Sequence, residues 1–147
     1  MSRKKHTKRQ AFLVAVALSH ASTLNAADCS QLHEFADPLV FPALEFRNTS
    51  AQCTMSIQGS GARGKLCEWV YPYRSGDAVN IYQEITQDLR ECFENNALLP
   101  DDQQVNHPDS YALFRVAVDG YVISASLKDK GALQETYVFV RLGPADE

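Results

Sequence analysis

Residues 75–93, SGDAVNIYQEITQDLRECF, form the one convincing helix of the chain, and the rest of the fold can be worked out from it. Apolar residues recur there mostly at steps of three and four, which places them on one helical face. They are Val79, Ile81, Tyr82, Ile85, Leu89, Cys92 and Phe93. Ser75 or Asp77 can cap the first free N–H groups, and Pro100 follows the end of the pattern. Such an amphipathic helix needs an apolar surface to cover.

Predicted strands that precede and follow the helix in the sequence supply that surface. Five segments have strand character: residues 52–58, 66–71, 111–118, 121–127 and 133–142. Asp119 and Gly120 predict a tight hairpin because both tolerate positive φ, and residues 128–131, KDKG, predict the next turn. We therefore predict an α+β fold of two layers, with one main helix packed on an antiparallel sheet of about five strands.

The segment before the first strand is less regular. Pro38 and Pro42 interrupt an apolar run within residues 27–47. This pattern predicts an irregular or extended arm packed on the core, with room for one helical turn before Pro38.

The first 26 residues have the composition of a signal peptide. Their basic residues all lie before an apolar run at residues 11–18, and they are Arg3, Lys4, Lys5, Lys8 and Arg9. As a helix that run spans about 12 Å, too short for a bilayer core of about 30 Å. We predict Sec-type export with cleavage after Ala26, with Ala21 and Ala27 as alternative sites. Residues 27–147 then form a single secreted domain in the periplasm or outside the cell, without a membrane span.

Removal of residues 1–26 changes the charge of the chain. The whole sequence has 14 basic and 18 acidic residues; five basic residues and no acidic ones lie in the first 26, so the remainder carries 9 − 18 = −9. This charge makes the domain a poor match for nucleic acid and a better one for a cationic protein partner. The alternative, which we favour, is that the excess acid keeps an exported domain soluble.

All four cysteines, Cys29, Cys53, Cys67 and Cys92, lie after the predicted cleavage site. An even number of cysteines in an exported chain predicts two disulfides, for which three pairings are possible. We favour Cys53 with Cys67, joining neighbouring strands, and Cys29 with Cys92, joining the N-terminal arm to the helix. The sequence has no C-x-x-C pair, so we predict no metal site.

Trp69, Tyr71 and Tyr73 occupy alternate positions and share one face if the chain stays extended through Pro72. Aromatic residues of this kind are enriched at binding surfaces, which makes the three a candidate partner site. The alternative, which we favour, is that they are core residues beneath the helix.

Two motifs resemble catalytic or cofactor sites. Residues 59–65, GSGARGK, match a phosphate-binding loop up to the lysine, but Leu66 replaces the Ser or Thr that would hold magnesium. We predict a hairpin loop there and no cofactor. His107 and Asp109, with a serine such as Ser110, contain the residue types of a hydrolase triad, but neighbours in one loop rarely converge as a triad must.

These features predict an exported, non-catalytic interaction module, such as an inhibitor, an immunity-type protein or an accessory envelope protein. The alternative is a small secreted hydrolase that uses His107 with Asp109 and a serine.

Overall fold

The computed structural model describes residues 29–57, 61–100 and 111–145. Its elements are α1 (Ser30–Ala36), β1 (Glu45–Phe46), β2 (Thr49–Ser50), β3 (Gln52–Ile57), β4 (Arg63–Pro72), α2 (Gly76–Cys92), β5 (Leu98–Leu99), β6 (Tyr111–Val118), β7 (Tyr121–Lys130) and β8 (Glu135–Pro144).

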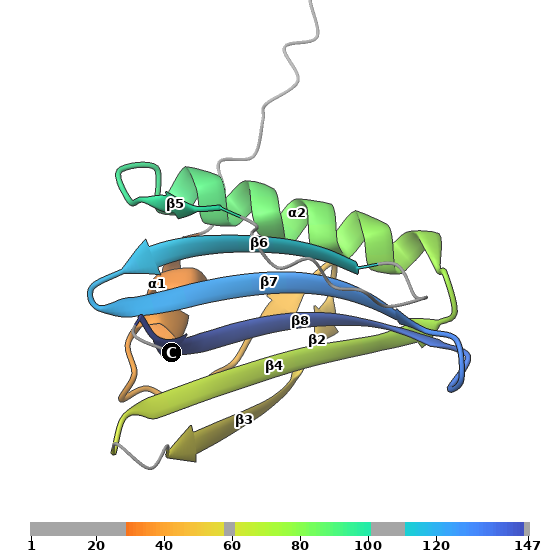
Figure 1. Cartoon of the computed structure of the whole chain (residues 1–147), viewed down its shortest axis with the longest axis horizontal. Coiled ribbons are helices and arrows are strands. Elements are labelled where there is room, and N and C mark those ends of the chain that lie inside the picture. Colours follow the sequence, from red (N-terminus) through yellow and green to blue (C-terminus); the bar gives the residue numbers. More distant parts are fainter. Residues whose placement is uncertain (1–28, 58–60, 101–110, 146–147) are drawn as a thin grey trace, which may run out of the picture.

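Six of the strands form one antiparallel sheet in the order β3-β4-β8-β7-β6-β5, and β1 pairs with β2 in a separate hairpin. Figure 1 looks onto this sheet, with α1 and the β1–β2 hairpin behind it. Helix α2 packs on the same side, where it contacts β4, β6, β7 and β8. The core lies between these layers and includes Ile85, Leu89, Val138 and Val140, each with no exposed surface.

The expected combination of one main helix and a large antiparallel sheet is confirmed, although the details differ. The sheet has six strands, because β5 adds two residues that pair with Val116 and Arg115 of β6. A second helix, α1, occupies part of the arm, since Leu32 and Phe35 give it an apolar face buried in the core.

The turn predicted at residues 128–131 is wrong. Strand β7 continues to Lys130, and the turn lies at residues 131–134. Asp129 is the reason: it points inward and is only 6% exposed, where its carboxylate accepts a hydrogen bond from Thr136 Oγ1 at 2.6 Å. The hairpin at Asp119 and Gly120 is confirmed, with φ of 47° and 81°.

Helix α2 begins as the sequence indicates, with Ser75 Oγ accepting a hydrogen bond from the backbone N–H of Asp77 at 3.2 Å. Ile81, Ile85 and Leu89 are buried, but Val79 is 39% exposed. The neighbouring Ala78 is buried instead of Val79, because the small alanine side chain fits where the helix lies against the core. The helix therefore turns its apolar face slightly away from the one that the sequence pattern predicted.

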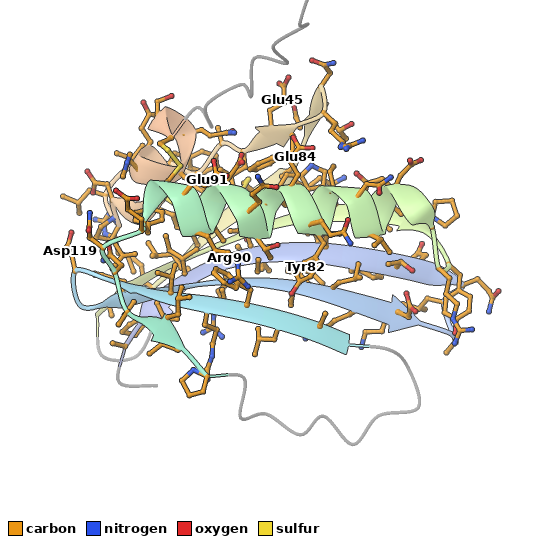
Figure 2. The ribbon with its side chains drawn as sticks, turned by 90° about the horizontal axis from the view of Figure 1, so that it is seen from above. Glu45, Tyr82, Glu84, Arg90, Glu91 and Asp119 are labelled. Atoms are coloured by element: carbon orange, nitrogen blue, oxygen red, sulfur yellow. A yellow bond between two sulfur atoms is a disulfide. The ribbon has the colours of Figure 1, made fainter. Side chains whose placement is uncertain are left out.

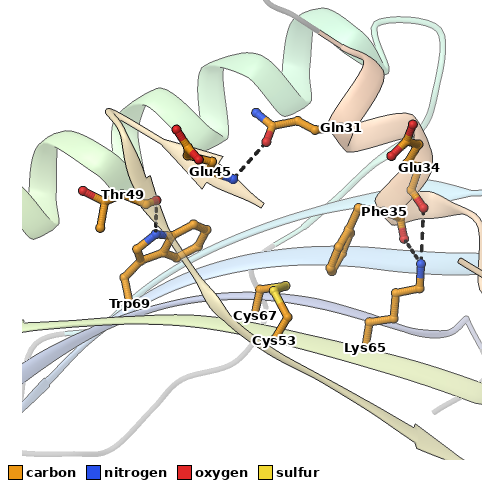
Figure 3. The surroundings of a disulfide bond; sticks show 9 residues. All are labelled: Gln31, Glu34, Phe35, Glu45, Thr49, Cys53, Lys65, Cys67 and Trp69. Carbon is orange, nitrogen blue, oxygen red and sulfur yellow. Dashed lines mark hydrogen bonds between the residues drawn. A yellow bond between two sulfur atoms is a disulfide. The ribbon is translucent and has the colours of Figure 1, made fainter. Parts of the chain in front are cut away.

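A buried lysine holds the end of α1. Lys65 is 1% exposed, and its Nζ donates to the carbonyl oxygens of Glu34, Phe35 and Asp37 at 3.2, 3.0 and 2.5 Å. Figure 3 shows the side chain reaching from β4 to the helix end. Positive charge at a helix C-terminus is favourable, because the last carbonyl groups lack partners within the helix. The lysine of the phosphate-loop pattern therefore binds the C-terminal end of α1.

All four cysteines are joined, in the pairs that the sequence analysis favoured. Cys53 and Cys67 are directly opposite partners on β3 and β4, with Cα atoms 4.1 Å apart. Cys29 and Cys92 link the residue before α1 to the last residue of α2, with Cα atoms 5.4 Å apart. One bridge therefore joins the N-terminal segment to α2, and the other joins two neighbouring strands of the sheet.

Candidate functional site

The three aromatic residues singled out in the sequence do not form one exposed surface. Trp69 is 3% exposed; its Nε1 donates to the carbonyl oxygen of Thr49 at 2.9 Å, and its ring meets Phe46 edge-on at 5.9 Å. Figure 3 shows the ring beneath the β1–β2 hairpin. Tyr71 is half-buried against the core, and Tyr73 lies beyond the end of β4 with the Arg74 guanidinium 5.0 Å from its ring. Trp69 is therefore a core residue, covered by the β1–β2 hairpin.

The candidate triad cannot be placed, because His107, Asp109 and Ser110 lie outside the described residues. Within the described residues, no three His, Cys, Asp or Glu side chains are grouped so that they could hold a metal ion. No helix in that part of the chain is long and apolar enough to cross a membrane.

The face of the sheet opposite the helices is the most distinctive surface of the described residues. We call it the open face. A hollow of about 480 Å³ lies on it, bordered by strands β4 to β8. Apolar side chains line it together with three cationic ones: Leu66, Leu99, Leu113, Val122, Phe139, Arg115, Lys128 and Arg141. No described carboxylate lines this hollow, although the chain has more acidic than basic residues.

Two arginines of the open face lie in one row across three strands. Arg115 of β6 pairs with Ser124 of β7, and Ser124 pairs in turn with Arg141 of β8. Arg115 Nη2 donates to the carbonyl oxygen of Pro100, which fixes the direction of that side chain. The Arg141 guanidinium lies over Gly143, close enough that a Cβ there would be 3.6 Å from it. The row therefore places Ser124 between two arginine residues in the strand register, with one guanidinium held at Pro100 and the other over Gly143.

Aromatic rings and a third cation lie beside this row. Lys128 Nζ is 5.6 Å from the centre of the Phe139 ring, a cation–π arrangement, and the Tyr137 ring stacks on Phe139 at 5.5 Å. Burial lowers the pKa of Lys128, and the nearby Lys130 lowers it further. Both causes disfavour the charged form of the ammonium group.

The opposite side of the molecule is acidic. Glu84 and Glu91 lie along α2, and Figure 2 shows them on the helix from above. Asp88 lies between them in sequence; burial first, then repulsion from Glu84 and Glu91, raises the pKa of its carboxyl group. One ion pair, Arg47 Nε to Glu84 Oε2 at 2.7 Å, offsets part of this charge. Negative charge is thus concentrated over the helix, and positive charge in the hollow of the sheet.

The open face is not predicted from the sequence. The arginine, serine and lysine residues of the hollow lie on three separate strands, and their spacing in the sequence matches no motif. Only the strand register shows that they are neighbours. The available signal was the alternation in residues 122–128, where Ser124, Ser126 and Lys128 share one face of a strand whose other face is apolar.

A scan against protein-family models and searches of curated proteins and of solved structures found no match.

Proposed function

We propose that the chain is an exported, non-catalytic interaction module that binds its ligand on the open face of the sheet. The hollow lined by apolar and cationic side chains is the observation that carries this proposal. Binding sites typically combine apolar walls with a few convergent polar groups, as this face does. The proposal keeps the predicted signal peptide at residues 1–26 and a location in the periplasm or outside the cell, and the two disulfides support an oxidising compartment.

The open face changes what we expect of the partner. The net charge of residues 27–147 favoured a cationic protein, and the acidic side of α2 is the surface that such a partner would meet. The hollow on the open face has the opposite character, because three cationic side chains, Arg115, Lys128 and Arg141, line it. We therefore assign the principal ligand to this hollow.

The proposal is tested by filling the hollow. Ser124→Trp adds a bulky ring between the two arginines, whereas Gln83→Trp adds the same ring to an exposed position of α2. Native mass spectrometry of each protein, recovered without detergent from the envelope of the source cells, reports what remains bound. We expect a bound mass with the wild type and with Gln83→Trp, and its loss with Ser124→Trp. Loss with Gln83→Trp alone would assign binding to the helix side instead.

A further inference from the structure

We propose that two copies of this chain pair through the outer edges of their β3 strands, which joins the two sheets into one continuous antiparallel sheet. This inference goes beyond the ligand of the open face and does not depend on it.

Strand β3 is the first strand of the six-stranded sheet, with β4 as its neighbour. Figure 1 shows it along the lower border of that sheet. Within residues 29–57, 61–100 and 111–145, no backbone hydrogen bond reaches the outer edge of β3. The nearest one, from the Ala51 N–H to the Leu44 carbonyl oxygen at 2.8 Å, lies before the strand begins. The outward N–H and C=O groups of β3 can therefore accept a further strand.

The sequence around β3 lacks the features that usually protect an edge strand. Such strands are commonly protected by charged side chains, by proline or by being very short. The stretch from Asn48 to Ala62 contains no proline and no Asp, Glu, Lys, Arg or His. The opposite edge of the sheet differs, because β5 has two residues and Pro100 follows it directly. The chain thus protects one edge of the sheet and leaves the other able to pair.

The distance between the bridged strands shows which backbone groups of β3 point outward. Opposite Cα atoms are about 4.5 Å apart at pairs without mutual hydrogen bonds and about 5.5 Å apart at hydrogen-bonded pairs. The Cα atoms of Cys53 and Cys67 are 4.1 Å apart, so the N–H and C=O groups of Cys53 point away from β4. Because this direction alternates along a strand, the same groups of Met55 and Ile57 also point outward.

These groups favour a second copy of the chain as the partner. An antiparallel strand is complementary to itself, so a two-fold axis can lie at Met55. Met55 then pairs with Met55 of the partner subunit, and Cys53 pairs with Ile57 of the partner subunit. The three resulting pairs form about six hydrogen bonds. Because β3 has no charged side chain, no like charges meet across this axis.

The same register covers an exposed apolar side chain. Cys53 packs against the core, so Ile57, four residues later, lies on the same side of β3 and is 75% exposed. Cys53 borders a hollow of about 260 Å³ together with Ala51 and Phe41, and Phe41 is 67% exposed. Pairing with Cys53 brings Ile57 of the partner subunit to this hollow. Each copy therefore removes apolar surface of the other from water.

The size of the contact indicates a weak, closed dimer. A six-residue strand is about 20 Å long, so the paired strands cover less than the roughly 800 Å² per partner of a standard interface. We therefore expect reversible association at micromolar concentrations. The two-fold contact uses the β3 edge of both copies, and the short β5 strands at the far ends do not extend the sheet. The assembly thus stops at two copies.

Sedimentation velocity of the exported protein with both disulfides formed, over roughly 5–500 µM, tests this association. We expect the fraction of dimer to rise across that range. Met55→Pro removes an N–H that points outward and leaves the ladder with β4 intact. It should therefore weaken dimerisation about tenfold while the circular dichroism spectrum stays unchanged.

Charge substitutions test the identity and orientation of the partner strand. Thr54 and Ser56 are exposed, and the proposed register places each opposite the other residue of the partner subunit. Changing both to lysine, or both to glutamate, should abolish the dimer because like charges then face each other. Mixing the two variants should restore it, and heavy-isotope labelling of one variant lets native mass spectrometry identify the mixed dimer. Asn80→Lys with Gln83→Lys, on the exposed side of α2, is the matched control and should dimerise like the wild type.

A protein that stays monomeric at every concentration would overturn the proposal and leave the β3 edge to a strand of another protein. A dimer that persists in both charge variants, or a mixture of the two that remains monomeric, would also overturn it. Because Thr54 and Ser56 are exposed, these variants test the edge even if Met55→Pro does not fold.

Discussion

Replacement of Lys65 by methionine should destabilise the protein by about 2–4 kcal/mol. Methionine keeps most of the length and apolar stem of the side chain but removes the three donors that reach the end of α1. The Phe35 carbonyl is buried, and a buried acceptor without a partner costs about 1–3 kcal/mol. The Glu34 and Asp37 carbonyls are partly exposed and can turn to water, so each adds less. Burial of the ammonium, which lowers the pKa of Lys65, offsets part of the loss.

Chemical denaturation followed by tryptophan fluorescence measures this change. Trp69 is the single tryptophan of the chain and is buried beside the N-terminal part, so its emission reports unfolding. Arg63→Met is the control, since Arg63 lies two residues earlier on the same strand with an exposed side chain, and it should change stability by less than about 0.5 kcal/mol. A Lys65→Met protein as stable as the wild type would refute the reasoning, and so would an equal loss in Arg63→Met.

Three further results are expected. Replacing Cys29 and Cys92 together by alanine should cost about 4 kcal/mol, because the bridge closes a loop between residues 63 positions apart; unchanged denaturation midpoints would contradict this. Asp88→Asn should raise the free energy of unfolding by about 0.3–1 kcal/mol at pH 7. The folded-state pKa of Asp88 is raised, so its charge destabilises the fold at neutral pH, and this penalty is lost as the pH falls through that pKa. The difference in free energy of unfolding between Asp88→Asn and the wild type should therefore vanish near pH 3. A difference that stays constant with pH would disprove the charge effect. Thr136→Val should cost about 1–3 kcal/mol in thermal or denaturant unfolding, since it leaves the buried Asp129 carboxylate without its hydroxyl donor, and a neutral effect would exclude that role.

The main elements could be predicted from local patterns. The Ser75 cap and the spacing of Ile81, Ile85 and Leu89 identify α2, and alternation identifies the long strands. Two-residue strands such as β5 have no periodicity to recognise. The turn at residues 128–131 was predicted because three charged residues and a glycine are typical of exposed turns, whereas Asp129 is buried with a hydrogen-bonding partner. The composition of the turn cannot show that Thr136, the opposite residue on the next strand, will supply that partner.

The candidate site depends on contacts between distant parts of the chain. Arg115 and Arg141 are neighbours of Ser124 only because β7 lies between β6 and β8. The sequence favours a core position beneath the helix for Trp69, whereas the residue is buried beneath a hairpin whose strands have two residues each. Both cases require the pairing order of the strands, which the residue types alone do not specify.

The pairing of β4 with β8 has a consequence for how the chain folds. The last strand inserts between β4 and β7, so the sheet becomes continuous only after the final residues of β8 have been made. Without β8, the β4 edge of the β3–β4 hairpin lacks its partner strand, and the Cys53–Cys67 bridge joins only the two strands of that hairpin. A chain shortened before Glu135 would therefore lack the strand that joins its two halves, and we expect such a fragment to aggregate or be degraded.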